Sequence, residues 1–162
     1  MIYRRLTIEE LEGLKPEFIR FLATNAVTAS DWEKLKSDSP ARADELLGLF
    51  SDIVFEKILQ EVEYLEYRTS HDIKTFHCQQ GKILLLGLRA EAGTDFDFTE
   101  NLSSSQMLQK MQSSNAKLQL YSAEKKYAKK REWEIFNLME NGALIAKEGE
   151  MYKVLEQLKP EE

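Results

Sequence analysis

The chain has 162 residues, of which 43% are hydrophobic and 31% charged, and its formal net charge is −6 at pH 7. This composition is that of a globular protein long enough to bury a core without disulfides or a structural metal. No stretch approaches the roughly 18 apolar residues that a membrane-spanning helix needs, and a single cysteine excludes an internal disulfide. We therefore expect one cytoplasmic globular domain over residues 1–162, without a signal peptide.

The first half of the chain is predicted to be helical. Thr7–Glu10 (TIEE) has the spacing of a capping box, and Ser30–Glu33 (SDWE) repeats that spacing before a second helix. Ser39-Pro40 suits the N-cap and first position of a long helix over residues 40–65, in which apolar residues recur at helical spacing.

The middle of the chain is predicted to supply a small sheet. Residues 73–78 and 82–89 indicate a hairpin, whose tight turn we expect to use a positive φ at Gly81. The run Ile83–Leu88 lacks polar alternation, as in a strand buried on both faces. Residues 117–121 alternate and predict a third strand with one solvated face.

The second half is predicted to add helices. Ser122 suits the N-cap of a helix over residues 123–141, which Gly142 ends, and Met151–Leu158 closes the chain as a short helix. The run Ala143–Ala146 fits either a strand or a helix. Between sheet and helix, the polar segment 91–115 is expected to contain a helical turn or two around Met107–Met111, after Ser103.

These elements predict an α+β fold class. A small, mainly antiparallel sheet combines the hairpin 73–89 with the strand 117–121. Several helices pack against it, including the long central helix 40–65, and a mobile polar loop lies around residues 91–105.

The two histidines and the single cysteine, His71, His77 and Cys78, lie close together in the sequence. Adjacent side chains of a strand point to opposite faces, so His77 and Cys78 are not expected to face one metal ion or substrate. Zinc sites use paired ligands such as CxxC or HxxxH, and the chain contains neither. We expect Cys78 to share a core face with Phe76, and His77 to share the other face with Thr75.

Other residue patterns that resemble functional sites are incomplete. The carboxylates Asp52, Glu56, Glu63 and Glu66 lack the Glu-x-x-His pair of di-iron bundles. The segment Asp95–Glu100 lacks the central glycine and last acid of a calcium loop. Glycine-rich nucleotide motifs and the serine-hydrolase motif are also missing. We therefore predict no catalytic residue, no metal site and no cofactor.

One surface stands out by its charge. Residues 117–131 contain six basic residues against one acid, a net charge of +5, so the rest of the chain carries −11. On the predicted helix, one arc contains the candidate partner-binding residues Lys125, Lys126, Lys129, Lys130 and Trp133. Tryptophan supplies contact area and lysine attracts acidic groups. The helix dipole disfavours lysines near a helix N-terminus, which favours an anionic partner. Alternatively, a neighbouring helix buries Trp133 and the lysine stems.

The overall pattern of the chain also resembles a known family. The segments that carry the resemblance are MIYRRLTIEELEGL, LFSDIVFEKILQEVEYLEYR and SAEKKYAKKREWEIFNLMENGALIAKEGEMYKVLEQL. They resemble a family of short bacterial proteins, mainly from Bacteroidetes, known as a domain of unknown function. The resemblance implies a bacterial cytoplasmic protein and assigns no catalytic or binding residue.

Two functions remain open from the sequence. The favoured one is a non-catalytic interaction module or accessory subunit that contacts an acidic partner through the lysines and Trp133. We expect that partner to be a protein, because the rest of the chain is acidic, with RNA as a less favoured alternative. No membrane partner is expected, and a second copy of the chain also remains open. The alternative is a small enzyme with a site near His71, His77 and Cys78. An exposed Trp133 on a shallow surface favours the first, and a deep pocket with an imidazole and a carboxylate favours the second.

Overall fold

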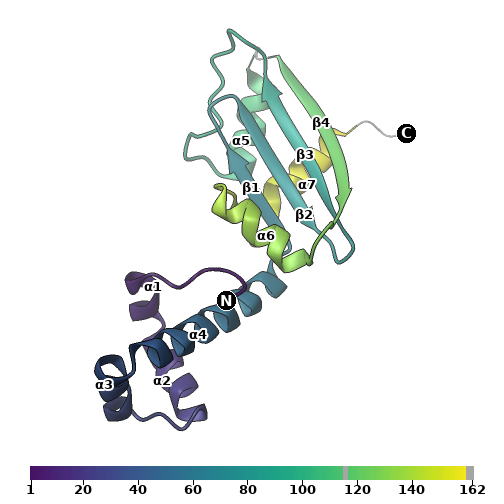
Figure 1. The fold of residues 1–162 in the computed structure, drawn as a ribbon. Helices are drawn as coiled ribbons and strands as arrows, with labels where there is room; N and C mark the ends of the chain where they lie inside the picture. The colour runs from purple at the N-terminus through teal and green to yellow at the C-terminus, as the bar shows by residue number, and fades with distance from the viewer. Residues whose placement is uncertain (115–116, 160–162) are drawn as a thin grey trace. The chain divides into compact units, whose positions relative to one another are not determined.

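The computed structural model describes residues 1–114 and 117–159 (Figure 1). Contacts divide the chain into two compact units, Met1–Gln60 and Glu61–Glu162, and each is described by itself. The single-domain organisation and the packing of the 40–65 helix on the sheet stay predictions.

The first unit is helical. Its helices are α1 (Ile8–Gly13), α2 (Lys15–Thr24), α3 (Ala29–Asp38) and α4 (Pro40–Glu61), which ends at the unit boundary. The predicted capping box at the start of α1 is confirmed, because the Glu10 N–H donates to Thr7 Oγ1 over 3.1 Å and the Thr7 N–H donates to Glu10 Oε1 over 2.8 Å.

The second predicted capping box is wrong in its register. The N-cap of α3 is Thr28, whose hydroxyl accepts from the Asp31 N–H over 3.1 Å while the Asp31 carboxylate accepts from the Thr28 N–H. Ser30 lies inside the first turn of α3. Both registers place a hydroxyl three residues before an acid, so the local pattern alone did not separate them.

Aromatic packing supplies the core of the first unit. Phe18 and Leu22 of α2 pack with Leu46 and Phe50 of α4, and all of them are buried. The Phe18 ring centroid lies 5.0 Å from that of Phe50 and 5.2 Å from that of Trp32 on α3. These apolar contacts hold the three helices together.

The second unit contains a five-stranded antiparallel sheet, and the predicted α+β class is confirmed. The strands are β1 (Tyr64–Arg68), β2 (Asp72–Cys78), β3 (Lys82–Ala90), β4 (Leu118–Lys126) and β5 (Leu144–Ile145). Their order is β4-β3-β2-β1-β5, with the predicted hairpin at its centre (Figure 1). Gly81 does not adopt the positive φ expected in the hairpin turn, so that detail is wrong.

The long helix is shorter than predicted, because residues 64–68 form a strand. Val62 and Leu65 continue the helical spacing of α4, which extended the prediction to residue 65. In the structure Leu65 is fully buried and lies opposite Phe76 in the β1–β2 ladder. Pairing with a neighbouring strand therefore overrides the helical pattern.

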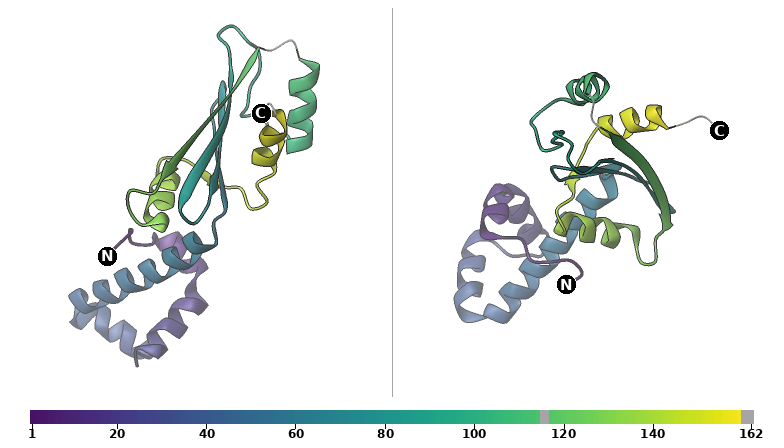
Figure 2. Two further views of the ribbon diagram at one scale, coloured as in Figure 1. Left: turned by 90° about the vertical axis from the view of Figure 1, so that its right-hand side faces the viewer. Right: turned by 90° about the horizontal axis from the view of Figure 1, so that it is seen from above.

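The other helices of this unit cover both faces of the sheet. They are α5 (Ser104–Ser113), α6 (Arg131–Glu140) and α7 (Glu150–Leu158). The helices α5 and α7 lie on one face, and α6 lies on the other (Figure 2). Beneath α5 and α7, Ile73, Leu86 and Leu88 pack with Met107, Met151 and Leu155.

The predicted helix 123–141 begins eight residues too early. Residues 122–126 continue β4 and pair with β3, with Ser122 opposite Leu86 and Lys126 opposite Lys82. Alanine, glutamate and lysine favour a helix locally, whereas the exposed backbone of β3 offers a ladder of hydrogen bonds. Gly142 ends α6 as predicted, with a positive φ, and Ala143–Ala146 contains the short strand β5.

The segment between β3 and α5 contributes to the core. The rings of Phe96 and Phe98 are buried, with centroids 4.7 Å apart. Ser103 caps α5 by accepting from the Gln106 N–H over 3.1 Å, which extends the predicted helical turn to ten residues. The mobility of the 91–105 loop stays a prediction.

Candidate functional site

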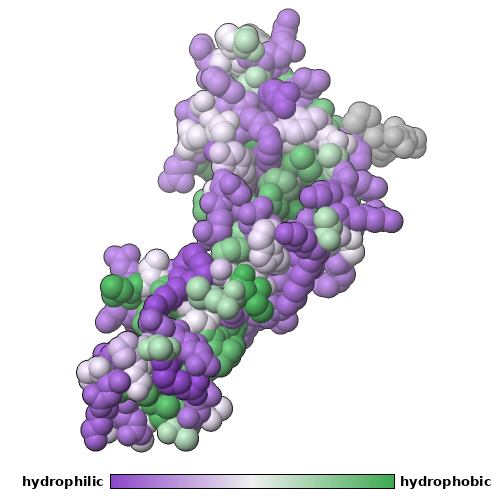
Figure 3. Space-filling model, in the orientation of Figure 1, coloured by the Kyte–Doolittle hydropathy of each residue, from purple (hydrophilic) through white to green (hydrophobic). Residues whose placement is uncertain are grey.

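A groove of about 560 Å³ lies between α6 and the sheet, and we call it the α6 groove. Its sheet side is lined by Phe76, Ile83, Leu85, Ala123, Glu124 and Lys125, and its other side by Tyr127, Ala128, Lys129, Trp133, Glu134, Asn137 and Leu138. Hydrophobic surface gathers over the strands beside α6 and is framed by hydrophilic residues (Figure 3). The groove is open and mainly apolar.

The strand register produces the apolar floor of the groove. Phe76 lies opposite Leu85, and Leu85 lies opposite Ala123. Paired residues project to the same face, so these three side chains lie side by side. Because α6 covers only one end of this face, Phe76 and Leu85 remain partly buried.

Arg131 fixes the start of α6 on the sheet. Its buried guanidinium donates to the carbonyl oxygens of Cys78 and Gln79, each over 3.0 Å, and to that of Val62. The Tyr127 hydroxyl donates to the same Gln79 oxygen over 2.8 Å. This anchor sets the width of the groove, and sequence reasoning counted Arg131 only as one more positive charge.

The lysine arc expected on a helix is wrong in its geometry. Lys125 and Lys126 lie on β4, Lys129 lies in the turn that follows, and Lys130 is the N-cap of α6. Adjacent strand residues diverge, so Lys125 faces the groove and Lys126 lies on the other face. The helix-dipole argument fails as well, because the first turn of α6 carries Glu132 and no lysine.

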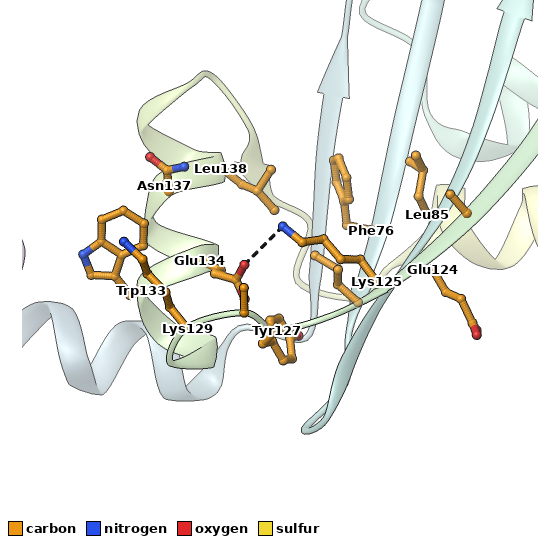
Figure 4. Close-up of a pocket in the computed structure, with 13 residues that line it drawn as sticks. Phe76, Leu85, Glu124, Lys125, Tyr127, Lys129, Trp133, Glu134, Asn137 and Leu138 are labelled. Carbon is orange, nitrogen blue, oxygen red and sulfur yellow. Dashed lines mark hydrogen bonds and ion pairs between the residues drawn. The ribbon is translucent and has the colours of Figure 1, made fainter.

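The structure nevertheless gathers part of the predicted set at the α6 groove. Lys125, Lys129 and Trp133 line it, whereas Lys126 does not. The Lys129 ammonium lies 4.6 Å from the centroid of the Trp133 ring, which is partly exposed. Trp133 and Lys129 lie together on one side of α6, and Leu138 points from α6 toward the strands (Figure 4).

Glu134 is the polar group inside this apolar groove. Its Oε1 atom lies 3.3 Å from the Lys125 ammonium (Figure 4). Its Oε2 atom is buried, and among the described residues none donates a hydrogen bond to it. A buried acceptor without a donor costs free energy, so a group that donates to Oε2 would bind favourably. The sequence offered no signal for this residue beyond its negative charge.

His77 and Cys78 lie on opposite faces of the sheet. The His77 ring stacks on Tyr64 with centroids 4.6 Å apart, and its centroid lies 5.4 Å from that of Tyr152 on α7. Cys78 is buried on the face that α6 covers, and burial raises the pKa of its thiol to about 12, against the opposing charge of Arg131. Such a thiol is a poor nucleophile at neutral pH.

The expected assignment of side chains to the two faces of β2 is confirmed, because Cys78 lies with Phe76 on one face and His77 lies with Thr75 on the other. Thr75 is fully buried on the His77 side of β2, and its hydroxyl donates to the Leu86 carbonyl over 2.7 Å. His71 lies just before β2, where its carbonyl accepts from the Ala90 N–H. The other face is also covered, because α5 and α7 of the same unit pack on it.

A second polar cluster lies on the same face of the sheet as α6, at the end that α6 does not cover. The Tyr121 hydroxyl donates to Asp72 Oδ1 over 2.5 Å and accepts from the Lys74 ammonium over 3.0 Å. Arg89 lies over the Tyr121 ring, 4.9 Å from its centroid, and a Cβ atom on Gly87 would come within 2.1 Å of that ring. Burial and the Asp72 hydrogen bond raise the pKa of Tyr121. The network satisfies its own members, so we regard it as structural.

Within residues 1–114 and 117–159, no group of three or more His, Cys, Asp or Glu side chains is arranged to hold a metal ion. No helix in that part of the chain is long and apolar enough to cross a membrane.

Comparison with known proteins gives one result. Neither the curated proteins nor the solved structures contain a match to the chain. A family model, described as a family of unknown function (DUF6495), matches residues 1–160. Since this match spans almost the whole sequence, and the three resembling segments lie inside it, the chain belongs to the DUF6495 family.

Proposed function

We propose that this protein is a non-catalytic interaction module, an accessory subunit that binds an acidic segment of a partner protein in the α6 groove. The observation that supports the proposal is the combination of an apolar floor, formed by Phe76 and Leu85, with cationic side chains at the edge. Apolar contact area with surrounding charge is the usual composition of a protein-binding surface.

Charge complementarity favours an acidic occupant. Lys125 and Lys129 line the groove, and Lys130 follows Lys129 directly in the chain. Lys125 is 68% exposed although it pairs with Glu134, so its charge still reaches solvent. A protein segment is favoured over RNA because the chain has a net charge of −6, which opposes a continuous phosphate backbone.

We place this module in the bacterial cytoplasm. The buried, protonated thiol of Cys78 needs no oxidising compartment, and the resemblance noted above points to a bacterial source. The alternative enzyme with a site near His71, His77 and Cys78 stays a hypothesis. No observation favours it over the groove, and rapid alkylation of native Cys78 near neutral pH would revive it.

A fluorescence titration tests the proposed function. Trp32→Phe leaves Trp133 as the single tryptophan, and the ligand is a peptide of aspartates and glutamates with one central tyrosine. We expect saturable binding that shifts Trp133 emission. Lys129→Glu should weaken it by about fivefold, since one surface ion pair contributes up to about 1 kcal/mol.

Two charge-matched variants serve as controls. Lys126→Glu changes the same charge on the other face of β4 and should weaken binding less than Lys129→Glu. Lys34→Glu changes an exposed lysine of α3 and should leave binding unchanged. Equal effects of all three variants would contradict the proposal, and tighter binding of polyuridine than of the peptide would reassign the groove to RNA.

A further inference from the structure

Glu134 places a negative group in a groove that we assign to an acidic partner. This carboxylate therefore restricts which side chain of the partner can lie beside it. Its Oε1 atom lies 3.3 Å from the Lys125 ammonium, which fixes the orientation of the carboxylate. The Oε2 atom is buried, and no described residue donates to it. The carboxylate therefore keeps one acceptor that no described residue uses at the wall of the groove, and a small rotation of the carboxylate presents it to the occupant.

The surroundings of this acceptor restrict the chemistry of the occupant. Phe76 and Leu85 from the sheet and Leu138 from α6 line the groove with apolar carbon, which suits a flat apolar group. A lysine or arginine side chain would also donate to Glu134. However, Lys125 and Lys129 line the same groove and would repel a second cation. A neutral donor on an aromatic ring satisfies both conditions.

We propose that Glu134 selects the anchor residue of the partner, and that this anchor is an aromatic side chain with a hydrogen-bond donor, tyrosine or tryptophan. The inference rests on the proposed function, because it describes the residue that an acidic segment inserts into the α6 groove. The anchor ring lies against Phe76, Leu85 and Leu138, and its O–H or N–H group donates to Glu134 Oε2. Acidic residues on either side of the anchor reach the lysines.

A matched pair of peptides tests this assignment on the wild-type chain. Two acidic peptides are identical except that the central residue is tyrosine in one and phenylalanine in the other, and calorimetry measures both affinities. We expect the tyrosine peptide to bind about tenfold more tightly, as for a hydrogen bond to a charged acceptor. A third peptide with a central lysine should bind more weakly than either.

The variant Glu134→Met completes the cycle. Methionine has a similar length without an acceptor, so the tyrosine and phenylalanine peptides should bind it equally. Glu134→Gln keeps a neutral acceptor and should retain a smaller preference for tyrosine. The affinities of the tyrosine and phenylalanine peptides for the wild-type chain show whether a donor on the anchor ring is preferred, even if Glu134→Met does not fold.

The outcomes separate this inference from the proposed function. If both peptides bind the wild-type chain equally and Lys129→Glu weakens both, the groove binds acidic segments and the selection by Glu134 is overturned. If the lysine peptide binds most tightly, the charge argument is overturned. If no peptide binds, both the inference and the proposed function fail.

Discussion

Cys78 lies on the sheet face that α6 covers, where burial raises the pKa of its thiol from 9.0 to about 12. The native thiol should therefore react with iodoacetamide at pH 8 far more slowly than a free cysteine, and the rate should rise to that of the free thiol in denaturant. Alkylation followed by mass spectrometry measures both rates. Fast modification of the folded chain would contradict the burial of Cys78.

The same pKa difference links Cys78 to stability at alkaline pH. A folded-state pKa above the unfolded value stabilises the fold below about pH 9, and this contribution is lost as the pH rises toward 12. Cys78→Ala removes the titrating group. Its free energy of unfolding should fall less steeply than that of the wild type between these pH values.

Arg131 is the residue on which the groove depends most. Its guanidinium donates to the carbonyl oxygens of Val62, Cys78 and Gln79. Arg131→Met removes the guanidinium from the Val62 and Cys78 oxygens, whereas Tyr127 still donates to the Gln79 oxygen, and we expect a loss of about 3 kcal/mol in the free energy of unfolding. Arg131→Lys keeps the positive charge but lacks the planar guanidinium that donates to several oxygens at once, so it should recover only part of this loss.

Urea denaturation followed by Trp133 fluorescence in the Trp32→Phe background measures the effect of Arg131. Lys126→Met removes one exposed positive charge from the same unit and should change stability by less than about 0.5 kcal/mol. Equal losses for Arg131→Met and Lys126→Met would contradict the anchoring role.

At the scale of single elements, the N-cap of α3 separates the structure from the sequence pattern, because the structure has Thr28 as the N-cap and the pattern predicted Ser30. Thr28 accepts from the Asp31 N–H, whereas Ser30 lies within the first turn. Thr28→Ala should lower the free energy of unfolding by about 1 kcal/mol, and Ser30→Ala should leave it nearly unchanged. Trp32 fluorescence in a Trp133→Phe background reports on α3. The reverse order of effects would restore the predicted Ser30 cap.

Local sequence patterns correctly predicted the elements in which residue propensity, apolar spacing and capping or turn residues all favour the same secondary structure. The capping box of Thr7, the hairpin of β2 and β3 and the helix after Gly149 followed from spacing and turn residues. The signals conflict at residues 64–68 and 122–126, where helix-forming patterns lie in strands. Which pattern prevails there depends on a neighbouring strand, and one-dimensional periodicity does not contain that information.

The candidate site likewise has one part that the sequence predicted and one part that depends on contacts between distant residues. Lysine content and Trp133 drew attention to a segment that lines the α6 groove, because charge and aromatic area are visible in the sequence. The groove itself depends on the register that places Phe76 beside Leu85 and on the Arg131 anchor. Both are contacts between residues far apart in the chain, so the predicted helical arc assigned Lys126 to a surface that it does not share.

At the scale of the whole molecule, we assign recognition to one face of the second unit. The sheet of the second unit is covered by α5 and α7 on one face, and α6 leaves the groove open on the other. Binding that depends on lysine charge should weaken as salt concentration rises, because screening shortens the range of exposed charges. The apolar floor should keep part of the affinity at high salt.

Amide chemical-shift mapping of the full chain with the acidic tyrosine peptide tests this account most directly. We predict that the largest shifts cluster at residues lining the α6 groove, including Phe76, Leu85 and Glu134. Residues around His77 and Tyr152 on the opposite face should shift little. Shifts concentrated on that opposite face, or spread evenly over both faces, would contradict the assignment of the α6 groove as the partner-binding site.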